Sequence, residues 1–236
     1  MGEIFVITDR LQCLPNGTTP LVAPREPPPA EMETVTYYKS MKPRMLSMLP
    51  PHIMYALYID SDYVVHSDLM PLLNERFRLG SSQEAAVGGR ANVLMFEDGN
   101  ENRPGQPLHG ALIIAHRTFS RLCFAEWNNQ LTRLKKTRDQ IALGFAVEKG
   151  MCRAGLLPKH KFTSYPNSDT VRNGGPWNML VHVSRTGRFD ALMREGLLDA
   201  LAEQLLDVHQ PNWWNKRHTC ARAPLSSNAS SHSTRT

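Results

Sequence analysis

The sequence predicts a single α/β domain with a central sheet, on three observations. The chain has 236 residues, of which 41% are hydrophobic and 21% charged, and this is enough for one domain with a sizeable core. Two apolar, β-prone runs at residues 55–59 and 111–115 predict strands buried on both faces. Apolar residues partly in helical phase predict a helix over residues 118–134, and a second helix opens at an acid over residues 139–149. Strands that alternate with helices are typical of an α/β fold.

The N-terminal part is expected to hold short elements around an irregular connection. Residues 3–7 form an apolar run that predicts a short buried strand. Residues 13–31 contain six prolines, so we expect a long irregular connection there rather than a domain. A helix is expected over residues 41–48, ended by Pro50 and Pro51.

The rest of the chain continues the alternation to its end. The further expected elements are a short helix at residues 69–76, a polar loop at 97–107, a turn-rich segment at 155–176, a strand at 179–183 and a helix at 189–205. We expect one domain over residues 1–210. The Ser/Thr/Asn-rich residues 221–236 are expected to form a disordered polar tail.

The composition excludes some partners and leaves others open. A net charge of +5 at pH 7 favours anionic ligands such as nucleotide phosphates, although a solvated surface explains it equally well. No basic stripe is interleaved with aromatic residues, so nucleic-acid binding is not expected. No apolar run approaches the ~20 residues that span a bilayer, and the N-terminus has no signal-peptide pattern. The four cysteines lack zinc spacing and close pairing, and they neither demand nor exclude an oxidising compartment.

The most informative motif is Asp60-Ser61-Asp62, directly after the run at residues 55–59. A strand that ends there presents carboxylates at the sheet edge where open α/β sheets bind ligands. Two aspartates one residue apart can share a hard divalent cation, and that cation can bridge the phosphates of a nucleotide. The alternative is a strand-end turn with solvated acids, because Asp-Ser-Asp is also good turn chemistry.

Two downstream segments bring further candidate groups. Asp139 and Gln140 open a predicted helix after the strand at residues 111–115. Gly110 leads into that strand, where a glycine lets the backbone approach a ligand closely. Asp139 alone is equally well explained as an acid that favours the N-terminus of a helix.

The last predicted strand supplies a histidine and is followed by an arginine. His182 lies in this strand, and a neutral imidazole can complete an acid-rich site for metals such as Mn²⁺. Arg188, just after Gly187, can meet a diphosphate. The alternative for His182 is a core histidine whose hydrogen bonds are satisfied within the fold.

Taken together and in this order, these segments resemble the GT-A nucleotide-sugar glycosyltransferases, most closely glycosyltransferase family 8, the glycogenin and galactinol synthase group. The resemblance covers about residues 3–190 and is carried best by Asp60-Ser61-Asp62 with its strand and by Asp139-Gln140. Partial matches are Ser67-Asp68-Leu69, Leu108-His109-Gly110 and a loosened His-x-x-Gly-x-x-Lys segment formed by His182 and Gly187-Arg188.

This resemblance implies a metal-dependent transferase that moves a hexosyl group from a nucleotide sugar, expected to be a UDP-sugar, to an acceptor hydroxyl. Asp60, Asp62 and His182 would hold Mn²⁺ or Mg²⁺ against the donor diphosphate. The acceptor would be a sugar, a glycan or a protein. Family members work in the Golgi lumen, the cytosol or bacteria, so the Golgi lumen and the cytoplasm both remain open. Family 8 enzymes retain the anomeric configuration, but no residue here is identified as a nucleophile.

Other residues receive roles through the same resemblance. Lys42 or Arg44, with Arg188, would add positive charge at the diphosphate. Asp139 would lie near the donor sugar or the acceptor as a catalytic group. The remaining expected donor-binding residues are Ser61, Gly110, Gln140 and Gly187.

The resemblance also implies a fold with one element missing. The segment at residues 3–9 resembles the second strand of the family, whose first strand holds the uridine end of the donor. We therefore expect a GT-A-like, Rossmann-like mixed sheet that is flanked by helices and lacks its first strand.

Two other functions fit parts of the pattern. Asp60-Ser61-Asp62-Tyr63-Val64 also fits the Asp-x-Asp motif of haloacid-dehalogenase-like phosphohydrolases, in which the first aspartate attacks phosphorus and the second is a general acid or base. The later acidic pair that such enzymes need is not found. The second alternative is an inactive glycosyltransferase-like binding protein, because a sheet without its first strand exposes unpaired edges.

Overall fold

A computed structural model describes residues 3–8, 18–22, 39–97, 108–134, 139–183 and 187–206 of the chain. The chain divides into two compact units, one formed by Met1–Ala23 with Pro211–Thr236 and the other by Pro24–Gln210. The expected tail at residues 221–236 lies outside the described residues, as does most of the expected loop at residues 97–107.

The first unit contains a two-stranded parallel sheet. Strand β1 (Ile4–Thr8) confirms the predicted N-terminal strand and pairs with β2 (Thr18–Val22). Its expected burial is wrong, because Ile4 is 63% exposed and residues 5–7 are only half-buried. The expectation that residues 13–31 are irregular throughout is therefore wrong at β2. Pro20 is tolerated there because each strand of a two-stranded sheet is an edge strand, which can leave one side of its backbone unpaired.

The second unit is built on a mixed four-stranded sheet with the order β3-β6-β5-β7. Its strands are β3 (Tyr55–Ile59), β6 (Leu108–His116), β5 (Val93–Glu97) and β7 (Ala154–Leu157). Strand β6 is antiparallel to both β3 and β5, and β5 is parallel to β7. Strands β3, β5 and β7 therefore run in one direction, and their carboxyl ends share one edge of the sheet with the start of β6. The mixed α/β fold predicted from the sequence is confirmed.

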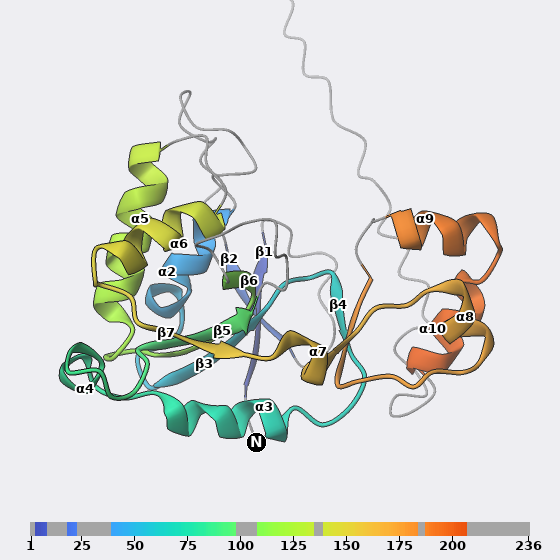
Figure 1. Ribbon diagram of the computed structural model, residues 1–236, viewed down its shortest axis with the longest axis horizontal. Coiled ribbons are helices and arrows are strands. Elements are labelled where there is room, and N and C mark those ends of the chain that lie inside the picture. Colours follow the sequence, from blue (N-terminus) through green and yellow to red (C-terminus); the bar gives the residue numbers. More distant parts are fainter. Residues whose placement is uncertain are drawn as a thin grey trace, which may run out of the picture. The chain divides into compact units, whose positions relative to one another are not determined.

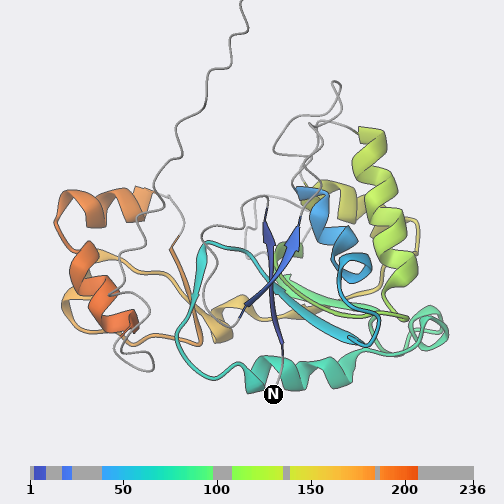
Figure 2. The same cartoon turned by 180° about the vertical axis from the view of Figure 1, so that it is seen from behind.

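Helices cover both faces of this sheet, as Figures 1 and 2 show from opposite sides. Helices α2 (Met41–Met48), α5 (Arg121–Leu134) and α6 (Asp139–Glu148) lie on one face. Helix α3 (Met70–Asn74) and the 3-10 helix η2 (Glu75–Arg78) lie on the other face, and α4 (Ser82–Ala86) follows them near the start of β5. The four helices predicted at residues 41–48, 69–76, 118–134 and 139–149 are thus confirmed, with small shifts at their ends.

One core cluster packs α3 and Leu79, which follows η2, against β5, β6 and β7. Its buried members are Tyr63, Leu72, Leu79, Leu94, Phe96, Ala111, Leu112, Ile114, Leu157, Phe162 and Leu180. Strand β5 was not predicted, because four apolar residues that include Leu and Met do not distinguish a strand from a helix. The prediction of β3 as a strand is confirmed, but its expected burial on both faces is wrong. Tyr55 is 43% exposed, because β3 is an edge strand that pairs only with β6.

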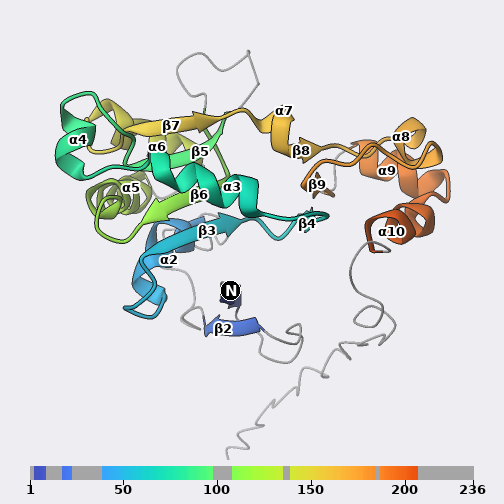
Figure 3. The ribbon, with the colours of Figure 1, turned by 90° about the horizontal axis from the view of Figure 1, so that it is seen from below.

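A smaller three-stranded sheet, with the order β4-β9-β8, extends this unit on one side (Figure 3). It consists of β4 (Tyr63–Val65), β9 (Leu180–His182) and β8 (Thr163–Ser164). Strand β9 confirms the strand predicted at residues 179–183. The segment at residues 155–176 is more ordered than expected, because it contains part of β7, α7 (Lys159–Phe162), β8 and α8 (Ser168–Arg172).

The predicted C-terminal helix is two helices, α9 (Gly187–Arg194) and α10 (Leu198–Leu206). They are separated at Gly196, whose φ of +68° lies in the left-handed region that ends helices. With α8 and β9 they enclose a second core made of Val171, Val181, Leu192, Leu201 and Leu205. Within the described residues, no helix is both long and apolar enough to cross a membrane.

A disulfide joins Cys123 on α5 to Cys152, which follows α6. The two cysteines are separated by 29 residues in the sequence and are 0% and 3% exposed. The sequence did not reveal this pairing, because the connection depends on how α5 packs against α6. Cys13 and Cys220 lie outside the described residues.

Candidate functional site

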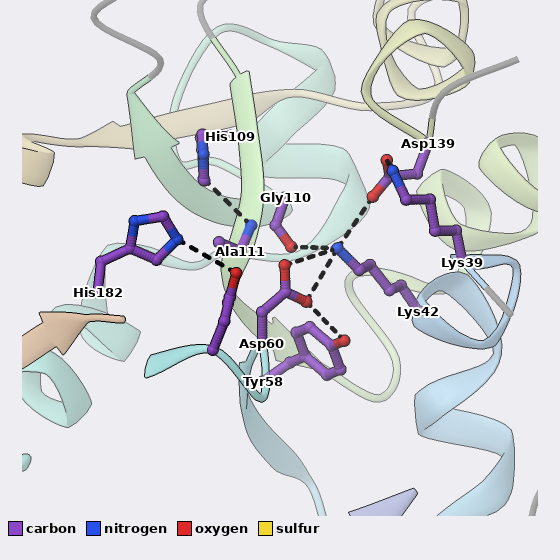
Figure 4. Close-up of polar contacts among 10 residues, drawn as sticks. Lys39, Lys42, Tyr58, Asp60, His109, Gly110, Ala111, Asp139 and His182 are labelled. Carbon is purple, nitrogen blue, oxygen red and sulfur yellow. Dashed lines mark hydrogen bonds and ion pairs between the residues drawn. The ribbon is translucent and has the colours of Figure 1, made fainter. Parts of the chain in front are cut away.

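The first acid of the motif lies at the carboxyl end of β3 and faces a buried lysine (Figure 4). The backbone N–H of Asp60 donates to Ala111 O at 2.8 Å, so β6 holds Asp60 in place. Lys42 from α2 places its Nζ 3.0 Å from Asp60 Oδ1 and donates to Asp60 Oδ2 at 3.1 Å. Tyr58 lies two residues before Asp60 and therefore on the same side of the strand. Its hydroxyl donates to Asp60 Oδ1 at 2.8 Å.

The same lysine binds a second acid from a distant helix. Lys42 Nζ lies 3.0 Å from Asp139 Oδ2, at the first residue of α6. It also donates to Gly110 O on β6 at 3.1 Å. Lys39, one helical turn before Lys42, approaches Asp139 Oδ1 at 3.3 Å. Four segments of the chain thus meet at one ammonium group.

A glycine makes this meeting possible. A Cβ added to Gly110 would lie 3.2 Å from Asp139 Oδ2 and 3.7 Å from Lys42 Nζ. The sequence predicted a close approach to the backbone at this glycine. In the structure the groups that approach are a protein lysine and a protein carboxylate.

Because Lys42 and Asp139 are buried, the pKa of each depends strongly on the charges beside it. Lys42 is 7% and Asp139 3% exposed. Burial lowers the pKa of Lys42, but the carboxylates of Asp139 and Asp60 outweigh it and hold the pKa above the usual 10.5. Burial likewise raises the pKa of Asp139, and the two lysines reverse this effect, so its carboxyl group titrates below the usual 3.8. Asp139 is therefore an ionised partner of Lys42, and a carboxylate with so low a pKa is a weak proton acceptor at neutral pH.

The backbone of Asp139 is held separately by a tryptophan. The indole Nε1 of Trp127, on α5, donates to Asp139 O at 2.8 Å. Trp127 is completely buried, and it lies one turn beyond the disulfide-bonded Cys123 on the same helix. Sequence reasoning missed Trp127 and Tyr58. The spacing of Tyr58 from Asp60 was a usable signal, whereas nothing in the local sequence marks Trp127.

The second acid of the motif pairs with the predicted histidine. Asp62 Oδ2 lies 3.2 Å from His182 Nε2, and Asp62 O accepts from the N–H of Val183 at 2.8 Å, so β9 anchors both residues. Because a carboxylate only accepts, Nε2 carries the proton in this contact. Burial lowers the pKa of His182, and the nearby Asp62 opposes this only in part. His182 is therefore neutral at pH 7, the form that binds metals.

The chemistry of this pair fits a divalent cation. The other oxygen of the same carboxylate, Asp62 Oδ1, is buried and has no hydrogen-bond partner, although the side chain as a whole is 42% exposed. An unpartnered carboxylate oxygen beside a neutral imidazole is a pair of donors that Mn²⁺ and similar metals accept. Asp60 is turned toward Lys42 and Tyr58 instead. Among the described residues no group of three or more His, Cys, Asp or Glu side chains is arranged around one point.

A second histidine and a lysine border this pair. The ring of His109 accepts from the N–H of Ala111 at its Nδ1 and lies 3.1 Å from Lys159 Nζ at its Nε2. Lys159 also lies over the ring of Tyr165 at 5.3 Å, and Tyr165 packs edge-on against His182. Sequence reasoning missed Lys159, which lies outside every motif that the family resemblance uses.

Within the described part of the chain, the other predicted site residues form no side-chain hydrogen bond or ion pair with the groups around Lys42 or with the Asp62–His182 pair. Ser61 is exposed between the two acids, and Gln140 is half-buried after Asp139. Arg44 donates to Asn128 Oδ1 at 3.2 Å and is thus engaged with α5. Gly187 and Arg188 begin α9, and their side-chain positions lie outside the described part of the chain.

Comparison with known proteins identifies no family for this chain. No family model matches the sequence, and no curated protein matches it. Among solved structures, the fold is similar to that of mouse xyloside xylosyltransferase 1 in its apo form, with a TM-score of 0.42 and 9% sequence identity. The match covers 64% of this chain and 65% of that structure. The match thus leaves about a third of that structure's length uncovered.

Proposed function

We propose that the second unit of this chain is a metal-dependent glycosyltransferase, which moves a hexosyl group from a nucleotide sugar, expected to be a UDP-sugar, to an acceptor hydroxyl. The observation that carries this proposal is the Asp60-Ser61-Asp62 motif at the carboxyl end of β3, with His182 beside Asp62. The edge of an α/β sheet is where such folds bind nucleotides.

Asp62 and His182 are the residues we propose to hold the cation, with Asp60 as the third ligand. A bound Mn²⁺ or Mg²⁺ supplies positive charge next to the diphosphate leaving group. Metal binding through His182 Nε2 would require the neutral ring to carry its proton on Nδ1 instead of Nε2, and the lowered pKa of the ring keeps it in the neutral form. Asp62 Oδ1 is already available.

Lys42 and Asp139 are proposed to position the site. Lys42 keeps Asp60 at the end of β3. Its own charge is already matched by Asp60 and Asp139, so we propose that the positive charge at the diphosphate comes from the bound cation and from Arg188. Asp139 is ionised and paired, so we assign it to orienting Lys42 and the donor sugar rather than to accepting a proton. Ser61, Gly110, Gln140, Gly187 and Arg188 remain proposed donor-binding residues.

The test is calorimetric titration of UDP into the purified chain with and without Mn²⁺. We expect binding that requires the metal. Asp62→Asn should weaken it at least tenfold, or about 1.4 kcal/mol, because it removes a proposed metal ligand from a partly exposed position. Asp60→Asn should have a similar effect but also disturbs Lys42, so its folding is checked by circular dichroism.

Asp169→Asn is the matched control, because Asp169 is an exposed acid on α8. It should bind UDP as the unaltered chain does. Metal-independent UDP binding that survives Asp62→Asn would overturn the metal site. A folded chain that binds no UDP would overturn the proposed function and favour the inactive binding protein.

The phosphohydrolase alternative fits the observed sheet less well. Haloacid-dehalogenase-like enzymes resemble a Rossmann fold, in which the strand with the nucleophilic aspartate lies in a parallel sheet. Among the described strands, β3 pairs only with β6, which is antiparallel to it. Hydrolysis of p-nitrophenyl phosphate by the chain, abolished in Asp60→Asn, would favour this alternative.

A further inference from the structure

The opposite edge of the main sheet carries a hollow that the proposed transferase site does not use. Its volume is about 460 Å³, and it is lined by Phe77, Arg78, Gly89, Arg90, Ala91, Arg153, Ala154 and Gly155. Ala91 precedes β5, and Ala154 begins β7. The hollow therefore lies at the amino ends of these strands, whereas Asp60 lies at the carboxyl end of the parallel strand β3. This volume is in the range of small-molecule sites.

Two of its three arginines are held in place by the backbone. Arg153 donates from Nη1 to Ala85 O at 3.0 Å and from Nη2 to Gly88 O. Arg78 pairs with Glu75 at 3.0 Å and donates from Nη2 to Leu156 O at 3.3 Å. Fixed guanidinium groups lose little freedom when they bind an anion, and their planar N–H groups match phosphate, sulfate and carboxylate oxygens.

Arg90 is the third arginine and is exposed. The acid that faces it is Glu84, whose carboxylate accepts from Ser81 N at 2.7 Å and caps α4. Hydrogen bonds from Ser81 lower the pKa of Glu84, with a smaller effect from Arg90. Glu75 and Glu84 thus balance two charges, and the three lining arginines leave an excess of one positive charge. The hollow attracts an anion.

Small residues form the floor and keep the hollow open. A Cβ added to Gly155 would lie 2.6 Å from Leu94 Cδ2, and one added to Gly89 would lie 2.8 Å from Glu84 O. The clash at Gly89 is with the backbone, so that position requires glycine, whereas a side chain at Gly155 would have to displace the side chain of Leu94. At Gly155 the same Cβ would lie 3.7 Å from Arg78 Nη2, so the guanidinium of Arg78 reaches over the floor.

An aromatic ring borders the arginines. Phe77 is 64% exposed, and the guanidinium carbon of Arg76 lies 4.3 Å from its ring centroid, so Arg76 covers part of one face. The exposed part of the ring is a flat apolar surface beside the charged hollow. The flat C–H face of a sugar packs well on a ring of this kind, and an anionic group on the same sugar then reaches the arginines.

We propose that this hollow binds a small sugar esterified with phosphate or sulfate, with the ester group between the guanidiniums of Arg78, Arg90 and Arg153 and the sugar ring on Phe77. An inorganic anion alone would leave Phe77 and most of the volume unused. An extended acidic peptide would need main-chain acceptors of β7, and Arg78 already occupies Leu156 O. This proposal does not depend on the transferase reaction.

The test is calorimetric titration of the full chain with glucose 6-phosphate and glucose 6-sulfate, and with glucose, inorganic phosphate and tetraglutamate as comparisons. We expect one of the two esters to saturate, and glucose and inorganic phosphate each to bind at least tenfold more weakly. Arg90→Gln and Phe77→Ala change exposed side chains and should each weaken ester binding, by at least tenfold and at least threefold respectively.

Arg121→Gln, an exposed arginine on α5, is the matched control and should leave ester binding unchanged. Asp62→Asn should also leave it unchanged, which separates this site from the proposed UDP site. Three results would overturn the proposal: no saturation by either ester in the millimolar range, inorganic phosphate binding as tightly as the esters, or tetraglutamate binding more tightly than both.

Discussion

The main sheet has two clusters of charged residues that differ in burial. One lies where β3 ends, which we call the first edge, and the other lies at the amino ends of β5 and β7, which we call the second edge. At the carboxyl edge of β3, Lys42 is buried and meets Asp60 and Asp139 at 3.0 Å each. At the other edge, Arg90 is exposed and the arginines surround a hollow floored by small residues. Buried charges must be paired within the protein, whereas exposed charges are solvated by water and remain available to a ligand. Substitutions at the first edge should therefore mainly lower the free energy of unfolding, and substitutions at the second edge should mainly weaken ligand binding.

Lys42→Met should produce the largest effect. It leaves Asp60 and Asp139 without their shared cation, and removal of one partner from a buried ion pair typically costs about 3–5 kcal/mol. The measurement is the free energy of unfolding in urea. Lys39→Met is the control, because Lys39 is 37% exposed in its side chain, and a pair with one exposed partner contributes only about 0–1 kcal/mol. Equal losses in the two variants would contradict the contrast between the edges.

Replacing both bridged cysteines should come next. The disulfide joins α5, which supports Asp139 through Trp127, to Cys152, which precedes Arg153 at the other edge. For a separation of 29 residues, the stabilisation from chain entropy is about 3–4 kcal/mol. The Cys123→Ala/Cys152→Ala variant should lose this amount in urea unfolding. Dithiothreitol should destabilise the unaltered chain but not the variant, and a loss below about 1 kcal/mol would contradict the structural role.

Trp127→Phe should have a moderate effect. It keeps an aromatic ring in the core but leaves Asp139 O without the indole N–H, which costs about 1–3 kcal/mol. Thermal unfolding measures this loss, and UDP titration shows whether the position of Asp139 matters for binding. Phe124→Leu is a useful comparison, since Phe124 is also buried on α5 and packs edge-on against Trp127. A similar loss of UDP affinity in both variants would indicate general loosening rather than loss of the hydrogen bond.

Lowering the pH should gradually remove the stability that ionised Asp139 contributes to the folded chain. The pKa of Asp139 is lowered in the folded chain, so its contribution to stability is present above pH 3.8 and is lost as the pH falls through the lower folded value. One group contributes a slope of at most about 1.4 kcal/mol per pH unit. The measurement is urea unfolding at several pH values from about 5 down to about 3, on either side of the ordinary carboxyl pKa. Asp139→Asn should have a shallower slope, and an unchanged slope would contradict the assignment.

Arg90→Gln should have the smallest effect on folding. Exposed substitutions away from buried networks usually change stability by less than about 0.5 kcal/mol. Urea unfolding of this variant should therefore match that of the unaltered chain, although its ester binding should fall. A loss comparable to that of Lys42→Met would show that the arginine edge is structural and would remove the difference between the two edges.

Several residues of the Lys42 network could be named from the sequence as candidates, but their contacts with one another could not. Asp60, Gly110 and Asp139 stood out because each lies where a predicted strand or helix begins or ends. That Lys42 binds all three depends on the pairing of β3 with β6 and on the docking of α6, neither of which is a local property. Tyr58 could have been found from its two-residue spacing to Asp60.

Elements of the fold that depend on local sequence were predicted better than those that depend on pairing between distant segments. The helices predicted at residues 118–134 and 139–149 have nearly correct ends. The apolar spacing over residues 189–205, in contrast, belongs to two helices separated at Gly196. Strand β7 was missed because Ala154 and Gly155 have little preference for a strand, and it forms only because β5 pairs with it. The arginine hollow was missed for the same reason. Its lining residues come from three separate segments, and no short motif connects them.

The ion network of Lys42 also orders events during synthesis of the chain. Lys42 and Asp60 are 18 residues apart in the sequence, whereas Asp139 is translated much later. A nascent chain that has emerged only as far as β6 can join Lys42 to Asp60 and to Gly110 O, but not yet to Asp139. Contacts of long sequence separation form late because closing long loops costs entropy. Docking of α6 is therefore the step that completes the contacts of Lys42, whereas the contact of Asp62 with His182 must wait for β9, which is translated later.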